Sequence, residues 1–501
     1  MADVDVLIVG AGLSGVGMAC HLERELPEVS YTVLESRDAL GGTWDLFRYP
    51  GIRSDSDMYT LGFRFRPWMG EKAIADGPSI LEYVRDTAAE YGVDRNIRYG
   101  HAVVRAEWSS ADGEWAVTAR SGGSDVTLRA KFLVSCSGYY RYDQGYSPEF
   151  PGREQFSGTI VHPQHWPQDL DYTDKQVAII GSGATAVTLA PAMAPVAAGV
   201  TMVQRSPTYV VSAPAKDPLA MSLRRFLPNR VVYPVVRAKQ VLVTTAIYQL
   251  CRRYPDRMKA LLRKYQTRWL PKGYDIDTHF TPSYNPWDQR LCLVPSGDLF
   301  REIRKGRVAM ATGGIETFTA DGLRLTTGEH VPADIIVTAT GLNLLAFGGV
   351  ELVVDGEPVD MPNTMAYKGI MLSGLPNFGY IIGYTNASWT LKADLAAEYL
   401  CRVIRHMRRK GFARCVPVRD PDVALEPFLD LDSGYIKRAQ SELPKQGSKA
   451  PWRLRQNYLR DLVTLRHGRL LDPALHFARP GAAALVPHAA PKPETPERVT
   501  A

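Results

Sequence analysis

Apolar residues along the chain repeat one arrangement twice. Near the N-terminus, the apolar run 4–9 leads into a glycine-rich segment and then into helically spaced apolar residues from Val16 to Leu26. The same order returns at 176–186, which reads Q-V-A-I-I-G-S-G-A-T-A. A short apolar run predicts a buried strand, and apolar residues at helical spacing predict a helix packed against it. The pattern therefore predicts two strand–loop–helix units.

Strict alternation of apolar and polar residues follows each of these units. It covers 101–135 and 306–341, with breaks at Asp-Gly or Gly-Gly dipeptides. Such alternation predicts meanders of β-hairpins, and each ends in an apolar run that returns to the parent sheet. The predicted fold class is α/β, with two Rossmann-like dinucleotide-binding domains and β-meanders.

Three further segments depart from this plan. Residues 217–280 show helical apolar spacing interrupted by prolines and predict a helical insert in the second domain. The Gly-, Pro- and aromatic-rich segments 41–58 and 284–298 predict loops that lie along a ligand. The Asn/Ser signal in 383–395 predicts the start of a helix whose positive end can face an anionic ring. The Pro/Ala-rich stretch 480–501 is expected to be disordered.

Charge is distributed very unevenly. The net charge is +6, yet 221–272 alone contains thirteen Lys and Arg residues and one acid, Asp256. Such asymmetry indicates a polyanionic neighbour or a basic groove. One interpretation is peripheral contact with an anionic membrane through 221–272, helped by Phe226 and Trp269. The other is a basic face that covers the entrance of an anionic cofactor.

Cysteine usage indicates a cytoplasmic location. The six cysteines are scattered and form no C-x-x-C motif, which argues against disulfides and zinc. His162 and His165 form H-x-x-H, but a proline lies between them and no acid or Cys cluster accompanies them, so no metal is expected. The N-terminus runs directly into a strand, so no signal peptide is expected. The sequence contains no window of about 18 uncharged apolar residues, so no membrane span is predicted. No nucleic-acid partner is expected.

The first glycine motif is G-x-G-x-x-G at Gly10, Gly12 and Gly15. The first glycine permits the turn, the second lets the backbone approach a pyrophosphate, and the third allows close helix packing. Glu35 ends the next predicted strand, Tyr31–Leu34, twenty residues after Gly15. A carboxylate there can accept hydrogen bonds from a ribose hydroxyl; the alternative is a solvated strand-end residue.

The second motif contains Gly181, Gly183 and Thr185. The strand that follows ends in Gln204, Arg205 and Ser206, with no acid where NAD-type sites place one. An arginine suits the 2′-phosphate of NADP, whereas an acid would repel it. The alternative is a surface arginine beside a turn.

Two nucleotide sites imply that hydride passes from a nicotinamide to a flavin. A disulfide reductase would need a cysteine pair, which the sequence lacks. An NADPH-dependent flavoreductase that donates electrons to a partner remains an alternative. A monooxygenase needs a fixed cation in a dry pocket.

The stretch 156–167 carries the pattern F-x-G-x-x-x-H-x-x-x-W-P. Its residues are Phe156, Gly158, His162, Trp166 and Pro167. It resembles the signature of Baeyer–Villiger monooxygenases, flavin enzymes that insert one oxygen atom of O2 beside a carbonyl. The segment G-G-T-W-D-L-F-R-Y-P-G-I-R-S-D-S-D-M-Y-T-L-G-F-R-F-R-P-W extends the resemblance to the bacterial ethionamide-activating branch of that family, from the N-terminus to about residue 475.

The resemblance implies roles for particular residues. Arg290, in D-Q-R-L, is similar to the family's arginine that stabilises a peroxyanion, and Asp55 resembles the acid that holds it. The signature residues of 156–167 resemble those that link domain movements. The remaining implied cofactor contacts are Gly42, Thr43 and Trp44 for FAD, and Gly181, Gly183 and Arg205 for NADPH. Gln289 stands where many members have a lysine that contacts the NADP phosphate, which leaves the NADPH preference open.

The implied activity is FAD-, NADPH- and O2-dependent conversion of hydrophobic ketones to esters through a C4a-peroxyflavin, with S-oxygenation of sulfides or thioamides as a second reaction. The alternative within this chemistry is an S/N-oxygenating flavin-containing monooxygenase. The predicted division of the chain is 1–145 and 343–479 for the FAD domain, 146–216 and 281–342 for the NADPH domain, and 217–280 for the insert.

Overall fold

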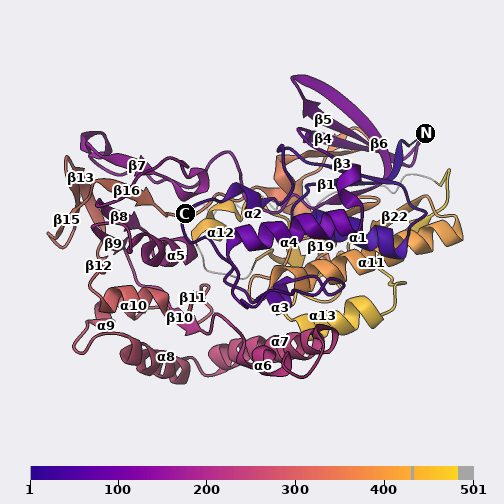
Figure 1. Cartoon of the computed structure of the whole chain (residues 1–501). Helices are drawn as coiled ribbons and strands as arrows, with labels where there is room; N and C mark the ends of the chain where they lie inside the picture. The colour runs from indigo at the N-terminus through magenta and orange to yellow at the C-terminus, as the bar shows by residue number, and fades with distance from the viewer. Residues whose placement is uncertain (1, 430–433, 483–501) are drawn as a thin grey trace, which may run out of the picture.

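Two sheet-based units lie side by side, and a layer of helices crosses the lower edge of both in the view of Figure 1. The computed structural model describes residues 2–429 and 434–482. The predicted disorder of 480–501 concerns a segment of which 483–501 lies outside the described residues. In the described ranges, no helix combines the length and apolar character that crossing a bilayer requires.

The first sheet joins a parallel layer to an antiparallel meander. Its order is β18-β17-β4-β5-β6-β1-β2-β3, with β21 also paired to β6. The long strand β6 belongs to both parts: Leu128 pairs with Val117 in the meander, whereas Leu133 pairs with Leu7 in the parallel layer. The strands are β1 (Val4–Val9), β2 (Tyr31–Leu34), β3 (Ile97–Arg98), β4 (Ala102–Ser109), β5 (Glu114–Ser121), β6 (Ser124–Ser135), β17 (Glu351–Val354), β18 (Glu357–Pro358) and β21 (Phe378–Tyr380).

Helices α1 (Leu13–Glu25), α4 (Gly77–Glu90) and α11 (Trp389–Lys410) pack on the parallel part of this sheet. Their apolar faces join one core with β1 and β2. The caps follow local chemistry. The Asp76 side chain accepts the Ser79 N–H at the start of α4, and Gly411 ends α11 at φ 68°, a left-handed conformation that favours glycine.

The second sheet is parallel, in the order β12-β9-β8-β16-β7, and carries a separate antiparallel meander, β13-β14-β15. Its strands are β7 (Thr159–Val161), β8 (Gln176–Ile180), β9 (Gly199–Gln204), β12 (Val308–Thr312), β13 (Ile315–Thr319), β14 (Gly322–Leu325), β15 (His330–Pro332) and β16 (Ile335–Thr338). Helices α5 (Ala184–Met193) and α10 (Asp298–Arg304) pack beside it. The central strands are almost wholly buried and apolar, as expected of a parallel sheet covered on its faces.

The segment 217–280 is helical and contacts both units. Its helices are α6 (Pro218–Leu223), α7 (Asn229–Arg253), α8 (Pro255–Trp269) and α9 (Ile276–Phe280). Helix α7 packs on α3 (Met58–Leu61) of the first unit, and α8 packs on α10 of the second. The segment leaves and rejoins the second unit through paired strands β10 (Val210–Ala213) and β11 (Cys292–Pro295).

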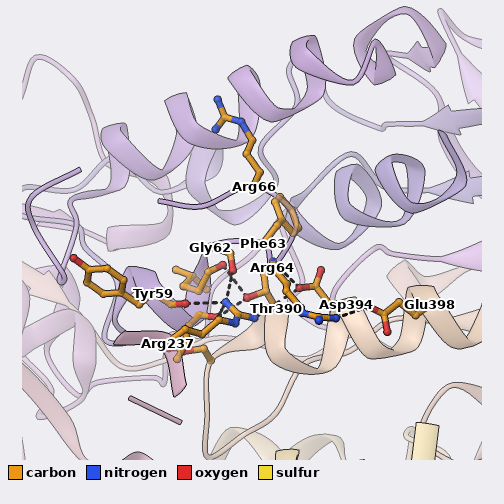
Figure 2. A network of polar contacts seen from close by, with 12 residues as sticks. Tyr59, Gly62, Phe63, Arg64, Arg66, Arg237, Thr390, Asp394 and Glu398 are labelled. Carbon is orange, nitrogen blue, oxygen red and sulfur yellow. Dashed lines mark hydrogen bonds and ion pairs between the residues drawn. The ribbon is translucent and has the colours of Figure 1, made fainter. Parts of the chain in front are cut away.

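A buried arginine fastens α7 to the first unit (Figure 2). The Arg237 guanidinium donates to the carbonyl oxygens of Tyr59 and Gly62, both at 2.8 Å, and lies 3.7 Å from the Asp394 carboxylate on α11. Asp394 also accepts from His21 on α1 at 3.3 Å. A buried charge costs stability unless it is paired and hydrogen-bonded, and here these carbonyls and Asp394 satisfy it.

Two connections between the units run side by side. Tyr140 pairs with Leu344 across them, and the Tyr146 N–H donates to the Gly341 carbonyl at 3.1 Å. The remaining elements follow the second connection. They are β19 (Ala366–Tyr367), β20 (Met371–Leu372), β22 (Arg414–Pro417), β23 (Leu425–Pro427), α12 (Gly434–Ala439), β24 (Lys445–Gly447), α13 (Tyr458–Asp461) and β25 (Leu475–Ala478).

The predicted α/β class, both meanders and the helical character of 217–280 are confirmed. Other expectations need correction. The segment 41–58 contains a one-turn helix, α2 (Thr43–Leu46), and 284–298 contains the strand β11. The predicted cap of α11 does not form through a side chain, because the Ser388 hydroxyl bonds to Thr60 instead. Trp269 is not an exposed interface residue, since its ring packs on Phe300.

Candidate active site

The first glycine motif forms a tightly enclosed loop between β1 and α1. A Cβ added to Gly15 would lie 1.8 Å from the Gly10 carbonyl oxygen, and one added to Gly10 would lie 2.8 Å from the Cys136 carbonyl. Gly12 caps α1 without a side-chain hydrogen bond, so the first N–H groups of the helix stay available to an anion. Gly42 faces this loop, since its Cβ would lie 3.0 Å from the Gly12 Cα.

Glu35 lies at the end of β2 and is 4% exposed, so it is not a solvated strand-end residue. One carboxylate oxygen accepts the Ala11 N–H at 2.7 Å, and the other accepts the Arg37 N–H at 3.0 Å. The carboxylate is therefore fixed against the glycine loop, where it retains acceptor positions for a hydroxyl.

Residues 42–46 cover the first loop. The Thr43 hydroxyl lies 3.3 Å from the Tyr142 hydroxyl, and Trp44 packs against the core. Sequence reasoning missed Asp45, which is 1% exposed and pairs with Arg37 at 2.6 Å and with Arg48 at 3.0 Å. The D-x-x-R spacing was the available signal. These ion pairs hold the covering segment in place.

Asp55 and Arg290 meet although 235 residues separate them. Asp55 comes from the first unit and Arg290 from the loop before β11. Arg290 Nε lies 2.8 Å from Asp55 Oδ2, and Nη2 lies 2.9 Å from Oδ1, which is a bidentate pair. The Asp55 charge raises the pKa of Arg290 above its ordinary value, against the opposing effect of burial. The guanidinium is a permanent, oriented cation.

Two tyrosines that sequence reasoning missed stand near this pair. The hydroxyls of Tyr139 and Tyr140 lie 3.3 Å apart, and burial raises the pKa of both, an effect that the Arg290 charge partly opposes. The Tyr139 ring lies 5.4 Å from Trp389, whose indole N–H donates to Ser14 of α1 at 2.7 Å. An aromatic wall thus extends from the first glycine loop toward Arg290. The G-Y-Y-R-Y run after the return strand was its signal.

The second glycine loop is open by comparison. A Cβ on Gly181 would lie 2.3 Å from the Ala339 carbonyl, but one on Gly183, the cap of α5, meets nothing within 4 Å. Gly183 is exposed, as are Arg205 and Ser206 after β9. Among the described residues, no acid forms an ion pair with Arg205. Thr185 forms a hydrogen bond to Tyr49, whose pKa burial raises to about 12.

The signature loop lies against the connections between the units. The Phe156 ring packs on Phe318. The His162 ring covers Gly145, where an added Cβ would lie 2.0 Å from it, and burial lowers the His162 pKa. The neighbouring Gln164 amide donates to the Arg141 carbonyl at 2.9 Å. The same loop contains the other signature residues, Gly158, Trp166 and Pro167. Trp166 packs against the core of the second unit.

Next to Arg290, a turn holds a tryptophan in a glycine-type conformation. The Asp288 N–H donates to the Asn285 carbonyl at 3.0 Å, and Trp287 has φ 73°. This position of the turn normally favours glycine. The Trp287 ring meets Tyr248 of α7 edge-on at 5.5 Å, and the half-buried Gln289 separates the turn from Arg290.

A narrow cavity lies between α7 and the start of α11. It is lined by Thr60, Val241, Tyr248, Ser388 and Leu391, among others. Its walls are a mixture of apolar side chains, hydroxyls and side-chain amides. Within the described ranges, no three His, Cys, Asp or Glu side chains gather as a metal site would require.

Comparisons with known proteins place the chain in a family. The "Flavin-binding monooxygenase-like" family matches residues 74–262, and the "NAD(P)-binding Rossmann-like domain" matches residues 8–68. The FAD-containing monooxygenase EthA of Mycobacterium tuberculosis is 58% identical over 95% of this chain and 98% of that protein. The chain belongs to the FAD-containing monooxygenases. EthA of Mycolicibacterium smegmatis is 53% identical to this monooxygenase, over 96% and 98% of the two chains.

Solved structures agree with this monooxygenase at the level of the fold. An oxidized steroid monooxygenase bound to NADP has a TM-score of 0.74 and 21% identity, over 95% of this chain and 99% of that one. An open structure of cyclohexanone monooxygenase has a TM-score of 0.71 and 20% identity, over 84% and 91%. The relatives confirm the predicted flavin monooxygenase family, and these structures confirm the predicted fold class.

Proposed function

We propose that this monooxygenase catalyses a Baeyer–Villiger oxidation of small hydrophobic ketones. A ketone, O2, NADPH and a proton give an ester, water and NADP⁺. Sulfides and thioamides are proposed as further oxygen acceptors. The names of the relatives and of the structural neighbours support this proposal, and the Asp55–Arg290 pair carries it.

The first unit fits FAD. Gly12 and Gly42 allow a diphosphate to approach the backbone at the start of α1, and Glu35 offers its carboxylate to the adenosine ribose. When bound, the flavin supplies the electrons that reduce O2. Trp389 and Tyr139 form an aromatic wall on the side of the loop where the ring is proposed to lie.

The second unit fits NADPH. The exposed start of α5 offers N–H groups to a diphosphate, and Arg205 offers a charge to the 2′-phosphate. Gln289 is proposed to contact the same cofactor from the loop beside Arg290.

Arg290 is proposed to stabilise negative oxygen during the reaction. Its charge persists at every working pH, and Asp55 fixes its direction through two hydrogen bonds. The Arg290 side chain is 39% exposed, and exclusion of water from it when the cofactors are bound is proposed to strengthen its electrostatic effect. His162 and Trp166 are proposed to couple the two units, since their loop rests on the connection between them.

The experiment is Arg290→Ala, with Arg290→Lys as the matched control. We expect Arg290→Ala to retain FAD and to oxidise NADPH, but to lose ester formation by about 10²–10³-fold. Asp55→Ala should show a milder loss, with more hydrogen peroxide released. Ester and peroxide are measured beside NADPH consumption, with ¹⁸O2 as the label.

A normal ester rate in Arg290→Ala would contradict the assignment. NADPH consumption by the wild type without label in any product would favour the flavoreductase alternative. Label in sulfoxides but never in esters would favour the S/N-oxygenating one.

We propose a cytoplasmic location, supported by six cysteines that are all buried and free. We also propose peripheral contact with an anionic membrane through 221–272. The narrow cavity behind α7 is the proposed entrance for apolar substrates.

A further inference from the structure

Helix α7 presents an apolar face to solvent. Between Val231 and Leu250, the side chains that are charged, Arg237 and Lys239, are buried and half-buried respectively. The exposed large side chains of this stretch are Val231, Val235, Leu242, Val243, Ile247 and Leu250. At 100° per residue they cover one side of the helix over several turns.

Exposed apolar side chains also stand in the segments before and after this stretch. Phe226, in the turn before α7, is 84% exposed, and Leu261 on α8 is 57% exposed. Helix α13 lies beside α7 (Figure 1), and its Tyr458 packs near Val241. Val463, which follows α13, is 62% exposed. Proteins rarely leave a large contiguous apolar surface in contact with water, so exposure of these side chains favours a docking role for this face.

Cations flank the apolar face. Arg225 and Arg230 stand at its start, and Arg253 and Arg257 at its end, all exposed. In the part of the chain that the structure describes, no acid forms an ion pair with any of the four. The nearby Asp256 lies 3.7 Å from Lys259. An apolar stripe bordered by arginines is typical of helices that lie flat in the headgroup region of anionic bilayers.

The charges around this face distinguish between two candidate partners, a lipid bilayer and a second copy of the chain. A two-fold contact would bring this face against itself, and the arginines at each end would meet arginines. An anionic bilayer offers phosphates to the arginines and hydrocarbon to the leucines at once. We therefore propose that the surface formed by Phe226 and the exposed face of α7 docks this monooxygenase on anionic membrane, with α7 parallel to the bilayer.

The opposite side of α7 gives this docking a catalytic consequence. Arg237 holds α7 on Tyr59 and Gly62, so the whole first unit comes to the membrane with it (Figure 2). Tyr248 on the inner side lines the cavity that reaches Ser388. The entry of apolar substrates from the bilayer at this cavity rests on the proposed reaction. The docking itself does not depend on that reaction.

The test is co-sedimentation of the FAD-loaded protein with vesicles. Phosphatidylglycerol–phosphatidylcholine vesicles should bind it at low salt, and binding should weaken at high salt or on pure phosphatidylcholine. Leu242→Glu should lower binding roughly tenfold or more, because an apolar anchor is lost and an acid faces the anionic surface. Val126→Glu is the matched control, since Val126 is exposed on β6 in the meander. It should bind as the wild type does. Arg253→Glu should lower binding by at least about fivefold.

A second readout uses the cysteines. All six are buried, so Leu242→Cys and Val126→Cys each provide one accessible thiol for an environment-sensitive fluorophore. Only the label at Leu242→Cys should shift to the blue on anionic vesicles.

No binding at low salt, equal loss in Leu242→Glu and Val126→Glu, or a blue shift of both labels would overturn the proposal. So would a wild-type dimer without lipid that Leu242→Glu converts to a monomer while vesicles bind neither. Oxidation of a water-soluble ketone without vesicles reports on the proposed function separately, because Leu242 is remote from Arg290 in function and its substitution leaves that reaction intact.

Discussion

The two glycine loops use the same strand–loop–helix device in different surroundings. The first is enclosed by Gly42, Cys136 and the buried Glu35, whereas the second leaves Gly183 and Arg205 exposed. The difference lies in what covers each loop, because residues 42–46 face only the first. We infer that the covered loop retains its cofactor through turnover, whereas the open one exchanges its cofactor each cycle.

The largest difference between the two loops is expected when the third glycine of the first motif, Gly15, is replaced. Gly15→Ala places a methyl group 1.8 Å from the Gly10 carbonyl oxygen, so α1 must move and bound FAD should be lost completely. Gly183→Ala is the matched control, because its methyl group meets nothing within 4 Å. It should keep full FAD and raise only the KM for NADPH. Flavin absorbance per protein decides this, and a full complement in Gly15→Ala would contradict the enclosed-loop account.

The next largest effect is expected at Glu35. Glu35→Arg removes the proposed ribose acceptor and places a cation beside Arg37, so the FAD Kd should rise by up to about 100-fold. Glu35→Gln, which keeps the size, should lose less. Flavin released on dilution is measured by fluorescence. A fully yellow Glu35→Arg protein would show that the carboxylate does not hold the cofactor.

On the open loop, Arg205→Ala should raise the KM for NADPH by about tenfold and leave NADH unchanged. The exposed side chain contributes a charge-assisted contact that solvent screens, which places the loss near the lower end of its usual range. Gln289→Lys should sharpen the preference for NADPH. Equal losses for both nicotinamides would assign Arg205 a structural role.

The smallest effect concerns stability rather than cofactor binding, at the brace of α1, which is the pairing of His21 with Asp394 of α11. Burial alone would lower the pKa of His21, but its hydrogen bonds to Asp394 and Glu25 raise it to about 9. A raised pKa stabilises the folded state fully below the unfolded value near 6.5. The free energy of unfolding should therefore fall by about 1–3 kcal/mol as the pH rises from about 6.5 to 9. Helix α5 carries no charged residue and lacks this dependence.

Denaturant titrations across this pH range measure the effect. His21→Gln is the control, because it keeps a polar group near Asp394 but cannot take up a proton. If the wild type and His21→Gln show the same pH slope, the brace does not titrate.

The sequence predicted the elements whose signals are local. The apolar run Tyr31–Leu34 became β2 at the predicted bounds, and the Asp-Gly and Gly-Gly breaks separated the meander strands. The repeated glycine motif revealed two units, because its geometry demands glycine wherever it occurs.

Elements that depend on distant partners were missed. The Ser388 hydroxyl bonds to Thr60 rather than capping α11, and Trp269 packs on Phe300 rather than facing solvent. Tyr139 and Tyr140 gain significance only because Arg290 arrives beside them from the other unit. The composition of 221–272 revealed its charge. Which side of α7 is exposed could not be predicted, because it depends on how the other side packs against the first unit.

We infer that the paired connections between the units let them bend about one axis and resist twisting. One strand of chain would let the units swivel freely, but Tyr140 with Leu344 and Tyr146 with Gly341 tie two strands into a ribbon. A ribbon flexes about one axis and resists torsion, because twisting stretches its hydrogen bonds. The His162 ring rests on Gly145 within this ribbon. Bending of the ribbon between the two nucleotide-binding units would therefore alter the contact between His162 and Gly145.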